Sequence, residues 1–102
     1  MQIYNIQSFT GKNIYSHKPV IKMIIDLEDI YNTPTKDIDG FNDKLVNAFP
    51  GLKKHYCSLG MEGGFIRRLK EGTYTAHVIE HLILELQSMT GYDVYFGRTR
   101  LL

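Results

Sequence analysis

The sequence predicts a small α+β domain, with an antiparallel or mixed sheet and two main helices packed on one face of that sheet. Two early segments, 3–9 and 19–27, are rich in the β-branched and aromatic residues that favour strands. Two later segments, 37–49 and 75–90, repeat apolar residues with the 3.6-residue period of an α-helix. Because the 102 residues contain no repeat or linker, we expect a single domain over 1–102.

Both strands are predicted in the first third of the chain. The segment Ile3–Phe9 alternates weakly, and a turn at Gly11-Lys12-Asn13 follows it. The second segment is the strongest strand candidate, and one of its faces is wholly apolar. We expect this face, which carries Ile21, Met23 and Ile25, to meet the core.

The middle of the chain is predicted to hold one helix, one loop and one short helix. The helix runs from about Asp37 to Phe49 and ends at Pro50-Gly51. The loop from His55 to Gly64 contains three glycines within five residues, which permits close approach of backbone to a ligand or simply a flexible connection. Phe65–Lys70 can form the short helix.

The longest predicted helix begins near Thr73 or Thr75, either of which can cap it, and ends near Thr90-Gly91. A strand is expected after it, over Tyr92–Phe96. Its apolar residues gather in one stripe, which we expect to face the core. The stripe comprises Ile79, Leu82, Ile83, Leu86 and Met89.

Two histidines lie on the opposite side of this helix from the apolar stripe. His77 and His81 are four residues apart, so they share one helical face and can bind one metal ion. Glu80 completes the pattern H-x-x-E-H, in which a glutamate serves as base for a water on the metal. Since these histidines face away from the stripe, a solvated pair on the surface is the alternative interpretation.

Composition excludes several classes of function. A formal net charge of +1 gives no reason to expect nucleic acid or an anionic membrane as a partner. No apolar run approaches the roughly 18 residues that a membrane span needs. The single cysteine, Cys57, excludes an internal disulfide and fits a reducing cytoplasm, so a cytoplasmic location is expected.

Several separate motifs occur together in the second half of the chain. They are Cys57-Ser58, Gly63-Gly64-Phe65, Arg68, Glu71-Gly72-Thr73, His77, Glu80-His81, Leu84-Glu85-Leu86-Gln87 and Phe96-Gly97-Arg98-Thr99-Arg100. In this order they resemble the N-terminal domain of cyanophycin synthetases. The resemblance extends from near Pro19 to Arg100, which makes it more specific than the histidine motif alone.

Cyanophycin synthetases are ATP-dependent ligases that build a poly-aspartate backbone with an arginine on each side chain. The resemblance implies that an ATP-grasp domain and a Mur-ligase-like domain follow this domain in the family, and neither is present in this chain. No G-x-x-x-x-G-K-[ST] phosphate loop occurs either, so no ATP site is expected. The resemblance also implies that the family's domain continues with at least one more strand, so we expect its last strand to lie outside these 102 residues.

The resemblance implies two functions, a structural role is a third, and we favour the first of them. The domain binds and positions the arginine–aspartate polymer, as an accessory to the ligase. As an alternative, it is a cryptic zinc-dependent peptidase that cleaves the polymer through the H-x-x-E-H helix. As a second alternative, it is a scaffold onto which the ATP-grasp and Mur-ligase-like domains dock. The expected partners are therefore the polymer and these two domains.

The resemblance implies that His77 and His81 are Zn²⁺ ligands and that Glu80 is the base. For the third protein ligand that catalytic zinc needs, Cys57 is favoured if its loop folds over the helix, with His55 next. Glu85 lies eight residues from His77, roughly 12 Å along a helix, too far to share the ion. It is expected to support the ligands or to bind substrate. The candidate substrate-binding residues are Arg67, Arg68, Glu85, Arg98 and Arg100.

Overall fold

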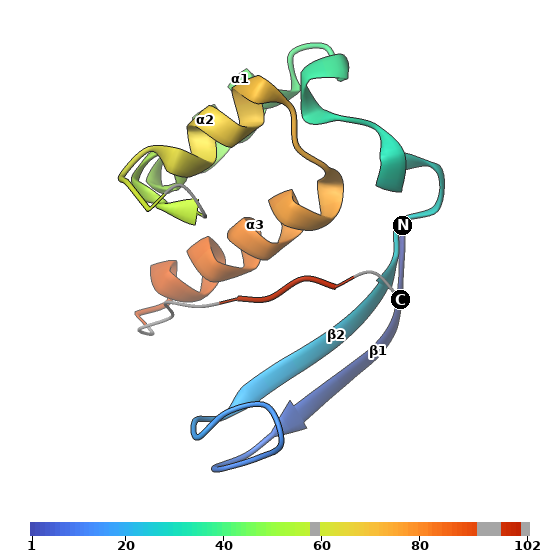
Figure 1. Ribbon diagram of the computed structural model, residues 1–102, viewed down its shortest axis with the longest axis vertical. Coiled ribbons are helices and arrows are strands. Elements are labelled where there is room, and N and C mark those ends of the chain that lie inside the picture. Colours follow the sequence, from blue (N-terminus) through green and yellow to red (C-terminus); the bar gives the residue numbers. More distant parts are fainter. Residues whose placement is uncertain (58–59, 92–96, 101–102) are drawn as a thin grey trace.

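The computed structural model describes residues 1–57, 60–91 and 97–100 of the chain. A two-stranded hairpin projects from one side of a group of helices, and the longest helix, α3, lies between the hairpin and the other helices (Figure 1). The elements in chain order are β1 (Gln2–Phe9), β2 (Val20–Asp26), the 3-10 helices η1 (Glu28–Asn32) and η2 (Thr35–Asp37), α1 (Phe41–Ala48), the 3-10 helix η3 (Pro50–Lys54), α2 (Gly64–Glu71) and α3 (Thr75–Met89).

The predicted α+β class and both predicted strands are confirmed. β1 and β2 pair antiparallel, with Gln2 opposite Asp26 and Phe9 opposite Val20. The side chain of Asn13 holds the connecting turn, because its amide donates to two carbonyls while its oxygen accepts two backbone N–H groups. Asparagine suits this position because its short amide can imitate a turn of the backbone.

The apolar face of β2 does not meet the core as predicted. Ile21 is 58% exposed, and Ile6 on the opposite strand is 57% exposed. Met23 and Ile25 are half-buried. The expectation is therefore wrong for Ile21, because the helices bury their own apolar side chains against one another and leave this part of the hairpin in solvent.

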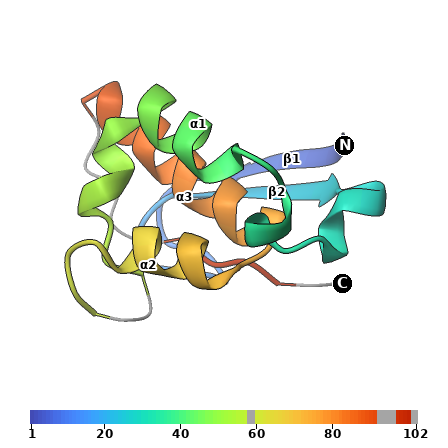
Figure 2. The ribbon, with the colours of Figure 1, turned by 90° about the horizontal axis from the view of Figure 1, so that it is seen from above.

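Among the described residues, the main cluster of buried apolar side chains comes from helices. Its buried members are Leu45 of α1, Leu52 of η3, Phe65 and Leu69 of α2, and Val78 of α3. Burying one such side chain contributes about 1.5–3 kcal/mol to stability. Figure 1 and Figure 2 show these helices gathered on one side of α3, with the hairpin on its other side. The core thus lies directly beside the part of α3 that carries the histidines.

α3 turns a different face to the core from the one that the sequence predicts. Val78, His81 and Glu85 are its buried residues, whereas Leu86 is 47% exposed and Met89 is 66% exposed. The alternative interpretation of a solvated histidine pair is wrong for His81, which is 5% exposed. The buried polar groups are tolerated on this face because partners from other elements meet them there.

Element boundaries agree with the sequence except in the middle and near the end of the chain. The predicted helix from Asp37 begins only at Phe41, because Gly40 adopts the left-handed conformation (φ 68°) and separates it from η2. α2 and α3 lie where the short and the long helix are predicted. The predicted strand Tyr92–Phe96 falls outside the described residues.

Candidate metal centre

Two imidazoles from α3 and one thiol from the loop after η3 meet beside the core. The Nε2 atoms of His77 and His81 are 3.1 Å apart. The Sγ atom of Cys57 lies 3.1 Å from the Nε2 atom of His77. Cys57 has a left-handed backbone conformation (φ 59°), which is costly for a residue with a side chain and is concentrated at functional sites. This conformation turns the loop so that its thiol reaches the helix.

The spacing and chemistry of these atoms fit a zinc ion. The three candidate ligand atoms all lie within 4.8 Å of one another. Zinc bonds of about 2.0–2.3 Å place tetrahedral ligand atoms roughly 3.3–3.7 Å apart. Two imidazoles and a thiol are donors that zinc prefers, and three protein ligands leave a position for water or substrate.

Both histidines are held in the neutral form that a metal requires. The pKa of His81 is lowered to about 4, mainly by burial and to a lesser extent by the neighbouring His77 and His55. Burial also lowers the pKa of His77; the nearby Glu80 opposes this effect, and the Arg68 charge adds to it. At neutral pH these imidazoles therefore keep a lone pair on one nitrogen.

The ring of Phe65 is the apolar wall of this cluster. It stacks on the imidazole of His81, with 4.0 Å between ring centroids and 18° between planes. The same ring meets His77 edge-on, at 5.5 Å and 88°. Phe65 is completely buried. Since aromatic contacts of this kind fix ring orientation, Phe65 limits how far either imidazole can turn.

A second contact fixes His77 from behind. The hydroxyl of Thr73 lies 2.9 Å from Nδ1 of His77, so the other ring nitrogen points toward the cluster. Thr73 is itself anchored, because its backbone N–H donates to the hydroxyl of Thr35, and its carbonyl accepts from the backbone N–H of Thr35. Thr73 was predicted only as a possible helix cap, and nothing in the sequence pattern indicated its contact with His77.

His81 is fixed from behind by His55. Nδ1 of His55 lies 2.9 Å from Nδ1 of His81, and Nε2 of His55 lies 3.4 Å from Oε1 of Glu85. Cys57 is thus the residue brought to the two α3 histidines, whereas His55, the other candidate ligand, lies on the far side of His81. Glu85 is 9% exposed, so it sits inside the molecule, where it contacts a histidine.

Glu80 lies on the face of α3 that the segment 97–100 covers. Its carboxylate accepts a hydrogen bond from the hydroxyl of Thr99 at 2.5 Å. A side chain at Gly97 would come within 3.0 Å of the Cγ atom of Glu80, so this segment runs close against the helix. The candidate base is therefore adjacent to the cluster but engaged by the C-terminal segment.

Comparison with known proteins identifies the family. The family described as cyanophycin synthase-like N-terminal domain matches residues 22–101. The chain belongs to this family. It is 48% identical over 102 residues to the cyanophycin synthetase of Crocosphaera subtropica, and 43% identical over 102 residues to that of Synechocystis sp.. Each match covers 98% of this chain but 12% of the relative, so the chain spans about an eighth of the length of these cyanophycin synthetases.

The predicted arginines of this cyanophycin synthetase-type domain occupy different environments. Arg68 is half-buried, lies near enough to influence His77, and has an Nε atom with no hydrogen-bond partner among the described residues. Arg67 is exposed and pairs with Glu71 at 3.1 Å. Arg98 and Arg100 are exposed on the segment that covers Glu80. Of these four arginines, Arg68 is therefore the one whose charge acts on the histidine cluster.

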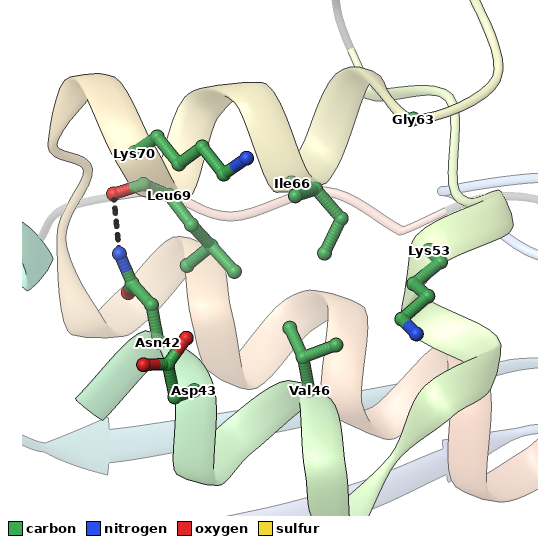
Figure 3. Close-up of a pocket in the computed structure, with 8 residues that line it drawn as sticks. All are labelled: Asn42, Asp43, Val46, Lys53, Gly63, Ile66, Leu69 and Lys70. Atoms are coloured by element: carbon green, nitrogen blue, oxygen red, sulfur yellow. Dashed lines mark hydrogen bonds between the residues drawn. The ribbon is translucent and has the colours of Figure 1, made fainter. Parts of the chain in front are cut away.

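A cleft of about 400 Å³ opens between α1, α2 and η3 (Figure 3). Its lining residues are Asn42, Asp43, Val46, Lys53, Gly63, Ile66, Leu69 and Lys70. None of them is a predicted site residue, and the sequence pattern did not single this cleft out. It combines one carboxylate, two ammonium groups and an apolar floor.

Within the ranges that the structure describes, no helix is long and apolar enough to cross a membrane.

Proposed function

We propose that this domain carries a zinc-dependent peptidase centre, with Cys57, His77 and His81 as the ligands and Glu80 as the base. The observation that carries the proposal is the convergence of the three ligand atoms within 4.8 Å. The lowered pKa values of both histidines support it further, since neutral imidazoles bind metal without first releasing a proton. A reducing cytoplasm, where we expect this chain to act, keeps Cys57 available as a thiol.

When bound, zinc supplies a Lewis acid that activates water for attack on an amide carbonyl. The residues of the chain supply the rest. Glu80 already accepts a hydrogen bond, from Thr99, and as a base it would accept a proton from water in its place. Arg68, half-buried beside His77, offers a positive charge that favours developing negative charge on a substrate oxygen. The relatives are cyanophycin synthetases, so we infer that the substrate is the polymer that such enzymes make.

The metal is tested by elemental analysis of the purified chain. We expect one zinc per chain in the wild type and none in the variant carrying both His77→Ala and His81→Ala. The matched control is His17→Ala, which removes an exposed histidine in the hairpin turn and should keep the zinc. Absence of zinc from the wild type after incubation with excess zinc would refute the metal centre.

Catalysis is tested separately, by following polymer length during incubation with the zinc-loaded chain. Glu80→Gln should keep the metal and lower the rate of cleavage about 100-fold or more, because the amide cannot act as a base. If Glu80→Gln cleaves as fast as the wild type, Glu80 is not the base. If the zinc-loaded wild type cleaves no polymer, the centre is a structural one.

We also propose that the domain binds and positions the polymer, and one observation favours this second function. The cleft of Figure 3 places Asp43 among two lysines, Lys53 and Lys70. A polymer of aspartate and arginine presents free carboxylates and guanidinium groups, so it offers the opposite charge to each of these residues. Binding through exposed charges should weaken with salt.

This second function is tested by polymer binding to the metal-free chain at low and high ionic strength. The double variant Lys53→Ala, Lys70→Ala should bind more weakly than the control Lys12→Ala, Lys18→Ala, which removes two lysines from the exposed hairpin turn. Equal affinity of the two variants would exclude the cleft. A chain with neither zinc nor polymer affinity would favour the third role, docking to the ATP-grasp and Mur-ligase-like domains, for which the exposed apolar side chains of the hairpin are the candidate surface.

A further inference from the structure

Glu85, His55 and His81 form a row of hydrogen-bonding groups that runs from the buried end of α3 to the proposed zinc site. Oε1 of Glu85 is 3.4 Å from Nε2 of His55, and Nδ1 of His55 is 2.9 Å from Nδ1 of His81. The Nε2 atom of His81 then faces Nε2 of His77, at 3.1 Å. Each imidazole therefore uses both of its nitrogens.

The chemistry of this row determines where its protons lie. An ionised carboxylate can only accept, so the Nε2–H group of His55 must donate to Glu85. A neutral imidazole with a proton on Nε2 has its lone pair on Nδ1, so His55 accepts at that atom. The donor is then the Nδ1–H group of His81, and the lone pair of His81 is left on Nε2, the atom that faces the other candidate ligands.

We propose that Glu85 and His55 are positioning residues for the metal centre, which fix the tautomer and the ring orientation of His81 so that its Nε2 lone pair meets the metal. This inference rests on the proposed zinc site. A metal-ligating histidine commonly donates its second ring N–H to a supporting acceptor such as a carboxylate, and loss of that support typically weakens metal affinity 10–100-fold.

The packing around Glu85 supports this role. The side chains of His55 and Glu85 are only 17% and 12% exposed, so their contact is shielded from solvent. Gly51 in η3 leaves the space that the carboxylate occupies, because a Cβ atom added there would lie 1.7 Å from Oε2 of Glu85. A glycine at position 51 is thus required for the carboxylate to reach its place beside His55.

The tautomer is tested first, by nitrogen-15 NMR of the imidazoles in the metal-free wild-type chain. We expect the proton of His81 on Nδ1 and the proton of His55 on Nε2. The reverse tautomer of His81 would overturn the proposal. This measurement needs no variant and no metal, so it remains decisive even if a substitution at position 85 prevents folding.

Metal affinity is tested by titration with Co²⁺, whose visible absorption reports thiolate ligation and tetrahedral geometry. Glu85→Leu should weaken Co²⁺ binding 10–100-fold, whereas Glu85→Gln, which keeps an oxygen acceptor for His55, should restore most of the affinity. Gly51→Ala should reproduce the defect with the carboxylate chemically intact. The matched control is Glu71→Leu, an exposed glutamate on α2, which should bind Co²⁺ as the wild type does.

The two proposals fail in different ways. A wild type that binds no Co²⁺ refutes the metal centre, while the NMR measurement still tests the tautomer of His81. A wild type that binds Co²⁺, together with folded Glu85→Leu and Gly51→Ala variants of unchanged affinity, leaves the metal centre standing and overturns the positioning role of Glu85 and His55.

Discussion

The helical part of the molecule and the β1–β2 hairpin use apolar residues in opposite ways. In the helices, Leu52, Phe65 and Leu69 are completely buried. In the hairpin, Ile6 and Ile21 are 57% and 58% exposed. Strand propensity alone therefore says little about where stability resides. The helical part carries the stability and the candidate metal centre together, so changes to its core should reach the centre, while changes to the hairpin should not.

The polar residues differ between the two regions in the same way. Thr35, Thr73, His81 and Glu85 are buried among the helices, and each is hydrogen-bonded. The polar groups that hold the hairpin turn, such as Asn13, are exposed and can exchange their partners for water. Removing a partner should therefore cost more in the helical part than in the hairpin.

The largest effect is expected from truncating apolar side chains in each region. Phe65→Ala should lower the free energy of unfolding by about 3–5 kcal/mol, because it removes a buried ring and leaves a cavity. Ile21→Ala should change it by less than about 0.5 kcal/mol, since this side chain is mostly exposed. Urea denaturation measures both values. Similar losses in the two variants would contradict the division between the regions.

The next effect concerns pH and the metal-free chain. The pKa of His81 falls from 6.5 to about 4 on folding, so the unfolded chain takes up a proton first as pH decreases. The contribution of neutral His81 to the free energy of unfolding is fully present above pH 6.5. As pH falls toward 4 this contribution, roughly 2–3 kcal/mol, is lost. Urea denaturation between pH 7 and pH 4, with a chelator present, measures it. His81→Asn should make the free energy of unfolding nearly independent of pH over this range. If the pH dependence is unchanged in this variant, other titratable groups cause it.

The smallest effect compares two hydrogen-bonded side chains. The hydroxyl of Thr35 accepts from the backbone N–H of Thr73, and Thr35→Val leaves that buried group without its acceptor. The loss should be about 1–2 kcal/mol, because the carbonyl of Leu69, which Thr35 also contacts, keeps its bond from Asn42. Asn13→Ala, at the exposed hairpin turn, should cost less. Thermal unfolding measures the loss of stability in both variants. A larger loss for Asn13→Ala than for Thr35→Val would contradict the expected order.

The sequence predicted the elements of this fold better than their packing. Period-2 and period-3.6 patterns located both strands and the helices that follow Gly40 and Gly63. The buried face of α3 was predicted wrongly, because the helical wheel ranks side chains by hydropathy alone. His81 is buried since Phe65 and His55 meet it from other elements, and no local pattern records such contacts.

The candidate centre was predictable to the extent that its chemistry is local. His77 and His81 are one helical turn apart, so their proximity follows from spacing. The approach of Cys57 depends on a left-handed residue in a loop, and the contact between Glu85 and His55 depends on a glycine in another element. These features join residues 20 to 34 positions apart in the chain, which a periodicity argument does not relate.

The stacking of Phe65 on His81 also gives this site a magnetic reporter of its own. An aromatic ring 4.0 Å from an imidazole and nearly parallel to it shifts the resonances of the imidazole's carbon-bound protons upfield. Any event that tilts either ring changes that shift. Proton spectra of the unlabelled chain would thus follow the arrival of a metal through the carbon-bound protons of the His81 imidazole.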